Sequence, residues 1–257
     1  MTADHNLTDR LVALTRDLIL IPSTDSQPQE RARAFSFFHN HLEALPDIRI
    51  GRHLSGGYES LVALPADREH ADILMIGHLD VIEHPDLELY RSHVENGRLY
   101  GPGAGDMKGA LAIMLKLFAD LHRAHPGISL GMVVTSDEER GGEHGVGHLV
   151  REAGLSARHA IVPDGGSLND VTVEEKGIAH LRLHARGHAA HAARPWLADN
   201  AAAKLTAALA RLAERLPNPP DIADEHWQPT CSLTTLRTPN RTLNCIPDRA
   251  EATLDVR

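Results

Sequence analysis

The sequence predicts an α/β fold, with a doubly wound, mostly parallel sheet in residues 1–171 and a small α+β domain in residues 172–257. In the first part, short apolar runs that end in polar residues alternate with segments of helical periodicity, which is typical of a doubly wound sheet. Beyond residue 171 the pattern changes to half-exposed, alternating segments and one alanine-rich helix, which indicates a separate domain.

Two helices are expected before the first strand. Leu11, Leu14 and Leu18 fall on one helical face, and Pro22 ends that helix. Residues 28–45 repeat apolar side chains at helical spacing and predict the second helix.

Strands and helices then alternate as far as residue 162. Strands are expected at residues 59–64, 71–77, 128–135 and 158–162, and helices at residues 107–124 and 144–153. Residues 85–103 form a long irregular excursion, and loops of that length in compact domains are often functional. In the second domain we expect strands at residues 171–185, 231–236 and 252–256, and a helix at residues 200–216.

Composition narrows the class of protein. The formal net charge is −9, which argues against a nucleic-acid partner because no basic surplus is present to neutralise phosphates. No stretch has the length of a membrane span, and the polar N-terminus lacks the apolar core of a signal peptide. Two cysteines in no metal-type spacing favour a reducing compartment, so we expect a cytoplasmic protein.

The apolar run Ile73–Val81 carries the first candidate site. His78 and Asp80 lie two residues apart at its end, so their side chains point to the same face of a strand. In open α/β sheets that edge is where ligands bind. The imidazole could bind a metal while the carboxylate holds its other nitrogen, or His78 could be a core histidine satisfied by its neighbour. Taken alone, the second interpretation is at least as good.

Further carboxylates follow other predicted strands, namely Asp106, the pair Glu138 and Glu139, and Asp164. Individually, Asp106 reads best as a helix N-cap and the glutamates as solvated side chains. Together they meet at one edge of the sheet, where they would repel one another unless a cation were present. Imidazole and carboxylate ligands suit zinc and related divalent ions.

Six segments, in order, give the chain a strong resemblance to a known family. They are GHLDV at 77–81, LYGPGAGDMKG at 99–109, TSDEERGG at 135–142, the Pro163-Asp164 site, GHAAHAARPWLADNAA at 187–202 and NCIPDRAEATLDVR at 244–257. Their order and spacing resemble the M20 family of co-catalytic zinc amidohydrolases, which includes glutamate carboxypeptidases, aminoacylases, acetylornithine deacetylases and succinyl-diaminopimelate desuccinylases. The resemblance implies a zinc-peptidase catalytic domain and a lid domain.

The resemblance also implies a pair of metal ions and their ligands. His78 and Asp164 match ligands of the first zinc, Asp106 matches the bridging ligand, and Glu139 matches a ligand of the second zinc. Cobalt or manganese are expected substitutes for zinc. In the family the peptide bond that follows the bridging aspartate is cis, so we expect a cis bond between Asp106 and Met107.

Catalytic and substrate-binding roles follow from the same resemblance. Asp80 matches the partner of the histidine ligand, Glu138 the general base, and His191 a lid histidine that stabilises the oxyanion in the partner subunit's active site. Asn244 and Arg257 match substrate-binding positions, with Arg257 suited to a carboxylate. Alternatively, Asn244 is a turn residue and Arg257 belongs to a surface ion pair. The implied substrate is an N-acyl amino acid or short peptide, and the implied assembly is a homodimer formed through the lid.

One departure leaves the activity open. The chain ends at Arg257, inside the lid domain, and the family's return segment with the histidine ligand of the second zinc has no counterpart. We therefore expect either an amide-bond hydrolase whose chain is C-terminally truncated, or a non-catalytic or single-metal remnant that acts as a binding protein. An aminopeptidase-like metal enzyme of another family would fit the carboxylates but not the lid motif.

Overall fold

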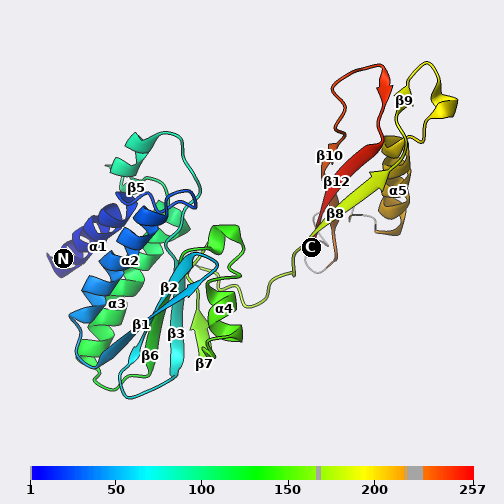
Figure 1. The fold of residues 1–257 in the computed structure, drawn as a ribbon. Helices are drawn as coiled ribbons and strands as arrows, with labels where there is room; N and C mark the ends of the chain where they lie inside the picture. The colour runs from blue at the N-terminus through cyan, green and yellow to red at the C-terminus, as the bar shows by residue number, and fades with distance from the viewer. Residues whose placement is uncertain (1, 166–168, 217, 219–227) are drawn as a thin grey trace. The chain divides into compact units, whose positions relative to one another are not determined.

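The chain forms two compact units, Met1–Val171 (unit 1) and Thr172–Arg257 (unit 2). The computed structural model describes residues 2–165, 169–216, 218 and 228–257 (Figure 1). Each unit has its own sheet, its own helices and its own buried apolar core.

Unit 1 is built on a five-stranded sheet with the strand order β1-β2-β6-β3-β7. The strands are β1 (Ile48–Ser55), β2 (Tyr58–Pro65), β3 (Ala71–His78), β6 (Leu130–Thr135) and β7 (Ala157–Ile161). β3 pairs in parallel with β6 on one side and β7 on the other, whereas β1–β2 and β2–β6 are antiparallel. The sheet is therefore mixed: the expected parallel pairing is found for β3 with β6 and β7, whereas β2 runs antiparallel to both of its neighbours.

A tight turn makes the pairing of β1 with β2 antiparallel. β1, which the sequence pattern did not predict, is joined to β2 by Gly56 and Gly57, with φ angles of 55° and 87°. A connection of two residues can join only antiparallel strands, and glycine adopts positive φ without a steric penalty. The alternation of Ile48 and Ile50 with charged residues was the overlooked signal for β1.

Three helices cover one face of this sheet and a short helix lies on the other (Figure 1). They are α1 (Thr2–Ile19), α2 (Pro28–Glu43) and α3 (Gly109–Ala124) on the first face, and α4 (Val146–Arg151) on the second. Side chains alternate along β2, so Leu61 packs in the core with α2 and α3, while Val62 packs with Leu149 of α4. This alternation gives unit 1 a core on each side of the sheet.

The order of the strands creates a switch point at β3. The chain passes from β3 through α3 to β6 on one side, and from β6 through α4 to β7 on the other side of β3. The carboxyl ends of β3, β6 and β7 therefore meet at one edge, where connections diverge to opposite faces and where ligands bind in such sheets. Between β3 and α3 lies the expected excursion, which contains the hairpin of β4 (His93–Glu95) and β5 (Arg98–Tyr100).

Unit 2 has a three-stranded antiparallel sheet with the order β10-β12-β8. Its elements are β8 (Ala179–Arg186), β9 (Ala190–His191), α5 (Ala201–Arg215), β10 (Cys231–Arg237), β11 (Cys245–Ile246) and β12 (Arg249–Val256). Strand β8 begins at Ala179, so the first part of the strand expected from residue 171 is not formed. Asn200 caps α5 by accepting hydrogen bonds from the amides of Ala202 and Ala203. No helix among the described residues is both long and apolar enough to cross a membrane.

Candidate metal centre

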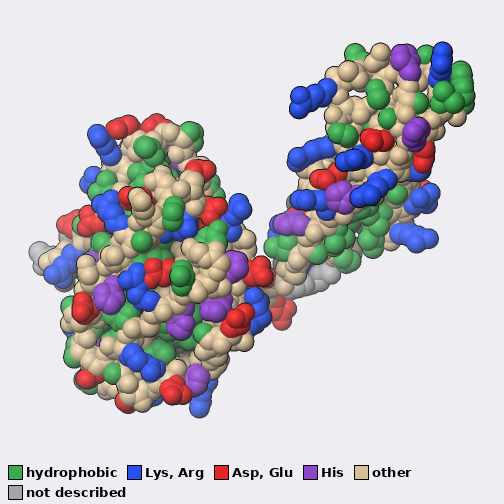
Figure 2. Space-filling model, in the orientation of Figure 1, with side chains coloured by type: hydrophobic (Ala, Val, Ile, Leu, Met, Phe, Trp, Pro, Cys, Tyr) green, Lys and Arg blue, Asp and Glu red, His purple; other side chains and the backbone are tan. Residues whose placement is uncertain are grey.

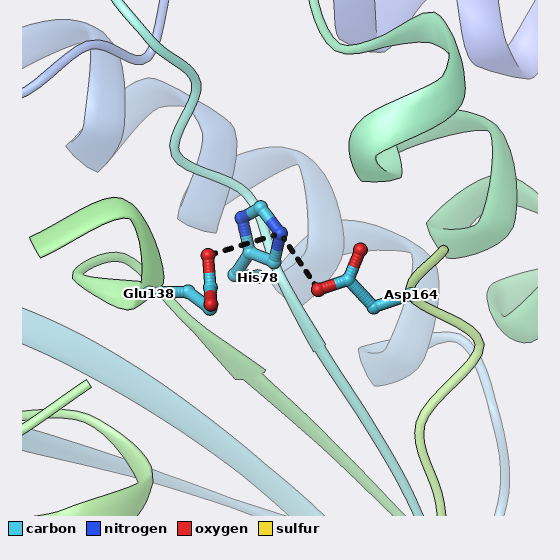
Figure 3. A group of neighbouring side chains, drawn as sticks. All are labelled: His78, Glu138 and Asp164. Carbon is cyan, nitrogen blue, oxygen red and sulfur yellow. Dashed lines mark ion pairs between the residues drawn. The ribbon is translucent and has the colours of Figure 1, made fainter. Parts of the chain in front are cut away.

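The candidate site lies where the three parallel strands of unit 1 end. His78 is the last residue of β3, Glu138 follows β6, and Asp164 follows β7. Figure 3 shows the carboxylates of Glu138 and Asp164 on either side of the His78 ring. One ligand atom from each of the three residues lies within 4.8 Å of the others, so the structure brings together side chains from the ends of three different strands.

The Nε2 atom of His78 is the centre of this group. It lies 3.0 Å from Asp106 Oδ1, 3.6 Å from Asp164 Oδ2 and 3.7 Å from Glu138 Oε2. His78 itself is 2% exposed, whereas the carboxylates open to solvent, with 65% of the Asp106 side chain exposed. A buried imidazole thus presents one nitrogen to three carboxylates that solvent ions can reach.

The other ring nitrogen of His78 fixes the tautomer. Nδ1 lies 3.0 Å from the main-chain carbonyl oxygen of Asp80, which can only accept a hydrogen bond, so Nδ1 carries a proton. In the neutral ring Nε2 then has a lone pair directed at carboxylate oxygens, and a cation between them removes the repulsion. Two atoms bound at about 2.0–2.2 Å to one tetrahedral zinc ion are about 3.3 Å apart, which is close to the distances of the three carboxylate oxygens from Nε2. The ligand atoms that all lie within 4.8 Å of one another come from His78, Glu138 and Asp164.

Asp80 connects two parts of the site. Its carboxylate Oδ2 accepts a hydrogen bond from the amide of Glu139 at 3.0 Å, and its Oδ1 lies 3.5 Å from His78 Nδ1. Asp80 is buried, and its Oδ1 has no hydrogen-bond partner among the described residues. One carboxylate therefore positions both the end of β3 and the turn that carries the two glutamates.

Electrostatics at the site favour a bound cation. Burial alone would lower the pKa of His78, but the neighbouring Asp80, Glu138 and Asp164 carboxylates outweigh it and raise that pKa to about 9. Burial, followed by repulsion from Asp164, Asp80 and Asp106, raises the pKa of Glu138 above its ordinary value despite the opposing effect of His78. The pKa of Glu139 is also raised, by burial and then by Asp106. These groups carry excess negative charge that a proton on His78 or a divalent ion can balance.

Asp106 is not a helix cap. The peptide bond between Asp106 and Met107 is cis, as the resemblance implied, and α3 begins only at Gly109. The N-cap residue of α3 is Lys108, with no capping hydrogen bond from a side chain. The carboxylate of Asp106 instead faces His78 Nε2. The interpretation of Asp106 as a helix N-cap, which its position in the sequence favoured, is therefore wrong.

The turn after β6 depends on Asp137, a carboxylate to which the sequence pattern assigned no role. Asp137 is buried, and its Oδ2 accepts hydrogen bonds from the amides of His144 and Gly145 at 2.7 and 2.9 Å. These bonds close the loop that starts with Glu138 and Glu139. The signal was the aspartate directly before the two glutamates and the glycines after them, because short carboxylates often hydrogen-bond to nearby backbone amides.

Lys108 is a second residue that the sequence pattern did not single out. Its side chain is 1% exposed, and Nζ donates hydrogen bonds to the carbonyl oxygens of Leu18 at 3.1 Å and Ile21 at 2.6 Å. Burial lowers the pKa of Lys108 to about 7, although Asp80 and Glu30 oppose that shift. Lys108 therefore joins the end of α1 to the segment that carries Asp106.

We expect Lys108→Met to lower the free energy of unfolding by about 1–3 kcal/mol, because two buried carbonyl oxygens lose their donor. The loss should be larger at pH 9 than at pH 6. A lowered pKa means that the folded wild type carries an unfavourable buried charge below pH 7 and is relieved of it as the pH rises. Denaturant melts at both pH values measure this. Lys116→Met, at an exposed pair with Asp120, is the control and should change little.

The candidate residues of unit 2 fall at two ends of its sheet. His191 in β9 pairs with Cys245 in β11, and the amide of Ala192 donates to the carbonyl oxygen of Asn244 at 2.9 Å, so His191 and Asn244 lie in adjacent segments. Arg257 follows the far end of β12, about 26 Å from the near end at 3.3 Å per residue (Figure 1). Its Nε donates to Asp255 Oδ1 at 3.0 Å. One chain therefore does not bring Arg257 to His191 and Asn244.

The fold and the carboxylate-histidine cluster place the chain among the α/β proteins with a candidate metal site at the carboxyl edge of the sheet. Residues 74–232 match the model of peptidase family M20/M25/M40. This chain belongs to that family.

Relatives and solved structures agree with this assignment. Two curated succinyl-diaminopimelate desuccinylases, from Caulobacter sp. (strain K31) and Rhodospirillum centenum, are 30% and 31% identical over 96% of this chain. The chain spans 65% and 67% of the lengths of these two relatives. The crystal structure of an M20 family metallo-carboxypeptidase from Sulfolobus solfataricus matches 96% of this chain and 70% of its own, with a TM-score of 0.73 at 16% identity. The chain thus has the M20 peptidase fold.

Proposed function

We propose that this protein hydrolyses an amide bond in an N-acyl amino acid or a short peptide with the help of a divalent metal. The observation that carries the proposal is the buried His78, whose Nε2 faces Asp106, Glu138 and Asp164 at 3.0–3.7 Å. Family membership supports the same chemistry, because the matching model describes peptidases.

We assign the metal ligands by position. His78, Asp106 and Asp164 would hold a first ion, and Asp106 with Glu139 would hold a second, with zinc preferred and cobalt or manganese as substitutes. A zinc ion held there supplies a Lewis acid that polarises the scissile carbonyl and makes water more acidic. Asp80 would keep His78 in the tautomer that leaves Nε2 free for the ion.

Glu138 would act as the general base. It would accept a proton from the attacking water and return that proton to the nitrogen of the leaving amine. Its raised pKa supports this role, because a base with a pKa closer to the operating pH also serves as the returning acid. Its position 3.7 Å from His78 Nε2 supports a competing role as a metal ligand, which the metal content of a Glu138 variant distinguishes.

Unit 2 would act as a lid and as the dimerisation surface. His191 would donate a hydrogen bond to the oxyanion, and Asn244 and Arg257 would bind the substrate. Because Arg257 lies far from the other two within one chain, all three can contact one small substrate only if a second copy contributes some of them. A homodimer would meet that condition. Sedimentation would test it by measuring the mass of the wild type and of His191→Ala, and a separate assay would compare their activities.

The substrate class can be tested with a panel of amides. We expect release of the free amine from N-succinyl or N-acetyl amino acids, or from a dipeptide, in the presence of zinc or cobalt. The names of the relatives favour N-succinyl substrates, whereas those of the structural neighbours favour peptides. Stoichiometric metal binding without turnover of any member would instead support a single-metal or non-catalytic binding protein. Absence of both metal binding and turnover would contradict the proposal.

A further inference from the structure

The sheet of unit 2 has one covered and one open face. Helix α5 packs against the first face, where the buried or half-buried side chains are Leu183 and Ala185 of β8 and Ala250 and Ala252 of β12. Because side chains alternate along a strand, the residues between and beside these point to the other face. That open face carries a set of charged side chains, namely His184 and Arg186 on β8, Arg249 and Glu251 on β12, and Arg237 on β10.

The strand register places like charges opposite each other. Arg186 pairs directly with Arg249, and Arg237 lies opposite Glu251, two residues further along β12. Like charges directly across two antiparallel strands destabilise the pairing. The arrangement therefore carries an electrostatic cost that an anion bound between the arginines would remove.

Among the residues that the structure describes, carboxylates do not neutralise this group. Glu251, the acidic residue in its midst, lies 3.7 Å from Arg182 Nε and 3.4 Å from His184 Nδ1. Within the described ranges, none of the guanidinium groups of Arg186, Arg237 and Arg249 has a carboxylate oxygen within 4.0 Å. Three arginines against one glutamate leave an excess of two positive charges.

These side chains surround a hollow rather than a flat surface. The hollow has a volume of about 650 Å³, and its lining includes His184, Arg186, Arg237, Arg249 and Glu251. Figure 2 shows basic side chains gathered over the strands of unit 2. Unit 2 has 11 Lys and Arg against 10 Asp and Glu, whereas residues 1–171 have 15 against 25, so the excess of negative charge lies in residues 1–171.

We propose that the hollow bounded by Arg186, Arg237 and Arg249 binds a small oxyanion with at least two negative charges. Guanidinium groups present paired donors that match the oxygens of a phosphate or a carboxylate, so the site suits a phosphorylated compound or a dicarboxylate. The site is built from unit 2 alone and shares no residue with the metal centre. It is therefore independent of the amide hydrolysis proposed above.

Binding can be measured by calorimetry on the whole chain at constant ionic strength, with inorganic phosphate, succinate and acetate as separate probes. We expect phosphate or succinate to bind and acetate to bind at least about tenfold more weakly, because a single charge offers fewer paired contacts. The double variant Arg186→Gln/Arg249→Gln should bind the dianion at least about tenfold more weakly than the wild type. Arg211→Gln, at an exposed position on α5, is the matched control and should leave the affinity unchanged.

Thermal stability gives a second measure of binding, because the difference in melting temperature between Arg249→Gln and the wild type should change sign when a dianion is added. Without a multivalent anion, Arg249→Gln should melt at or above the wild-type temperature, because it removes the Arg186–Arg249 repulsion. With a saturating dianion the wild type should melt at a higher temperature than Arg249→Gln, because the ligand binds only the folded form of the protein. Preference for phosphate over succinate would identify a phosphorylated ligand, and the reverse a dicarboxylate. Equal affinity in the wild type and the double variant, or no binding of either dianion, would overturn the proposal.

Discussion

Replacing Glu138 by glutamine is expected to lower kcat by about 10²–10⁴-fold and to leave the metal content unchanged, because glutamine keeps the shape of the side chain but cannot accept a proton. Elemental analysis after exhaustive dialysis measures the metal, and initial rates on the best amide of the panel measure the turnover. Unchanged turnover would contradict the assignment of Glu138 as the base. A loss of metal would make Glu138 a ligand, in line with its 3.7 Å distance from His78 Nε2.

Two neighbouring glutamates provide the comparison. Glu139→Gln should lower the metal content, because Glu139 is proposed as a ligand, and a normal content would refute that role. Glu143 lies in the same loop at an exposed position, so Glu143→Gln should change neither the turnover nor the metal content. The three variants alter the same functional group within one loop, so general damage to the loop would affect all of them alike.

The second large effect is expected at His78. His78→Gln should weaken divalent-metal binding at least about 100-fold, since it removes the nitrogen that the carboxylates surround. Zinc titration by calorimetry, with a competing chelator to bring the affinity into range, measures this. His122→Gln is a suitable control, because His122 contacts the carbonyl oxygen of Leu130 and lies outside the carboxylate cluster. Equal zinc affinity in the wild type and His78→Gln would contradict the site.

Binding at His78 should also depend on pH in a defined direction. The surrounding carboxylates raise the pKa of His78 to about 9, so in the metal-free protein the ring is protonated at pH 7 and the metal must displace that proton. Apparent zinc affinity should rise by up to about tenfold per pH unit below pH 9 and level off above it. In His78→Gln this part of the pH dependence should disappear.

Some of the site was predictable from the sequence because it depends on strand ends. An apolar run that stops at His78, and others that stop before Glu138 and Asp164, place polar groups at the carboxyl ends of parallel strands whatever the rest of the chain does. The proximity of these residues therefore followed from local patterns together with one rule of topology. Their individual roles did not, because each is a common cap or turn residue when it is considered alone.

Other features required the tertiary structure. The sheet is mixed because β2 pairs antiparallel with both β1 and β6. The short alternating pattern of β1 gave a weak signal that only its pairing with β2 makes clear. Lys108 reads as a surface residue at the start of a helix, yet its Nζ is buried against carbonyl oxygens at the end of α1, far earlier in the chain. Asp80 was expected to support His78, but its hydrogen bond to the amide of Glu139 depends on the packing of β3 beside β6.

Whether a divalent metal binds at Nε2 of His78 can be seen in a zinc-edge anomalous difference map from crystals grown with zinc. We expect a peak about 2.0–2.2 Å from His78 Nε2 and from carboxylate oxygens of Asp106 and Asp164. A second peak that shares Asp106 and approaches Glu139 would support the paired site. Full zinc occupancy elsewhere with no peak at His78 would show that His78 is not a metal ligand.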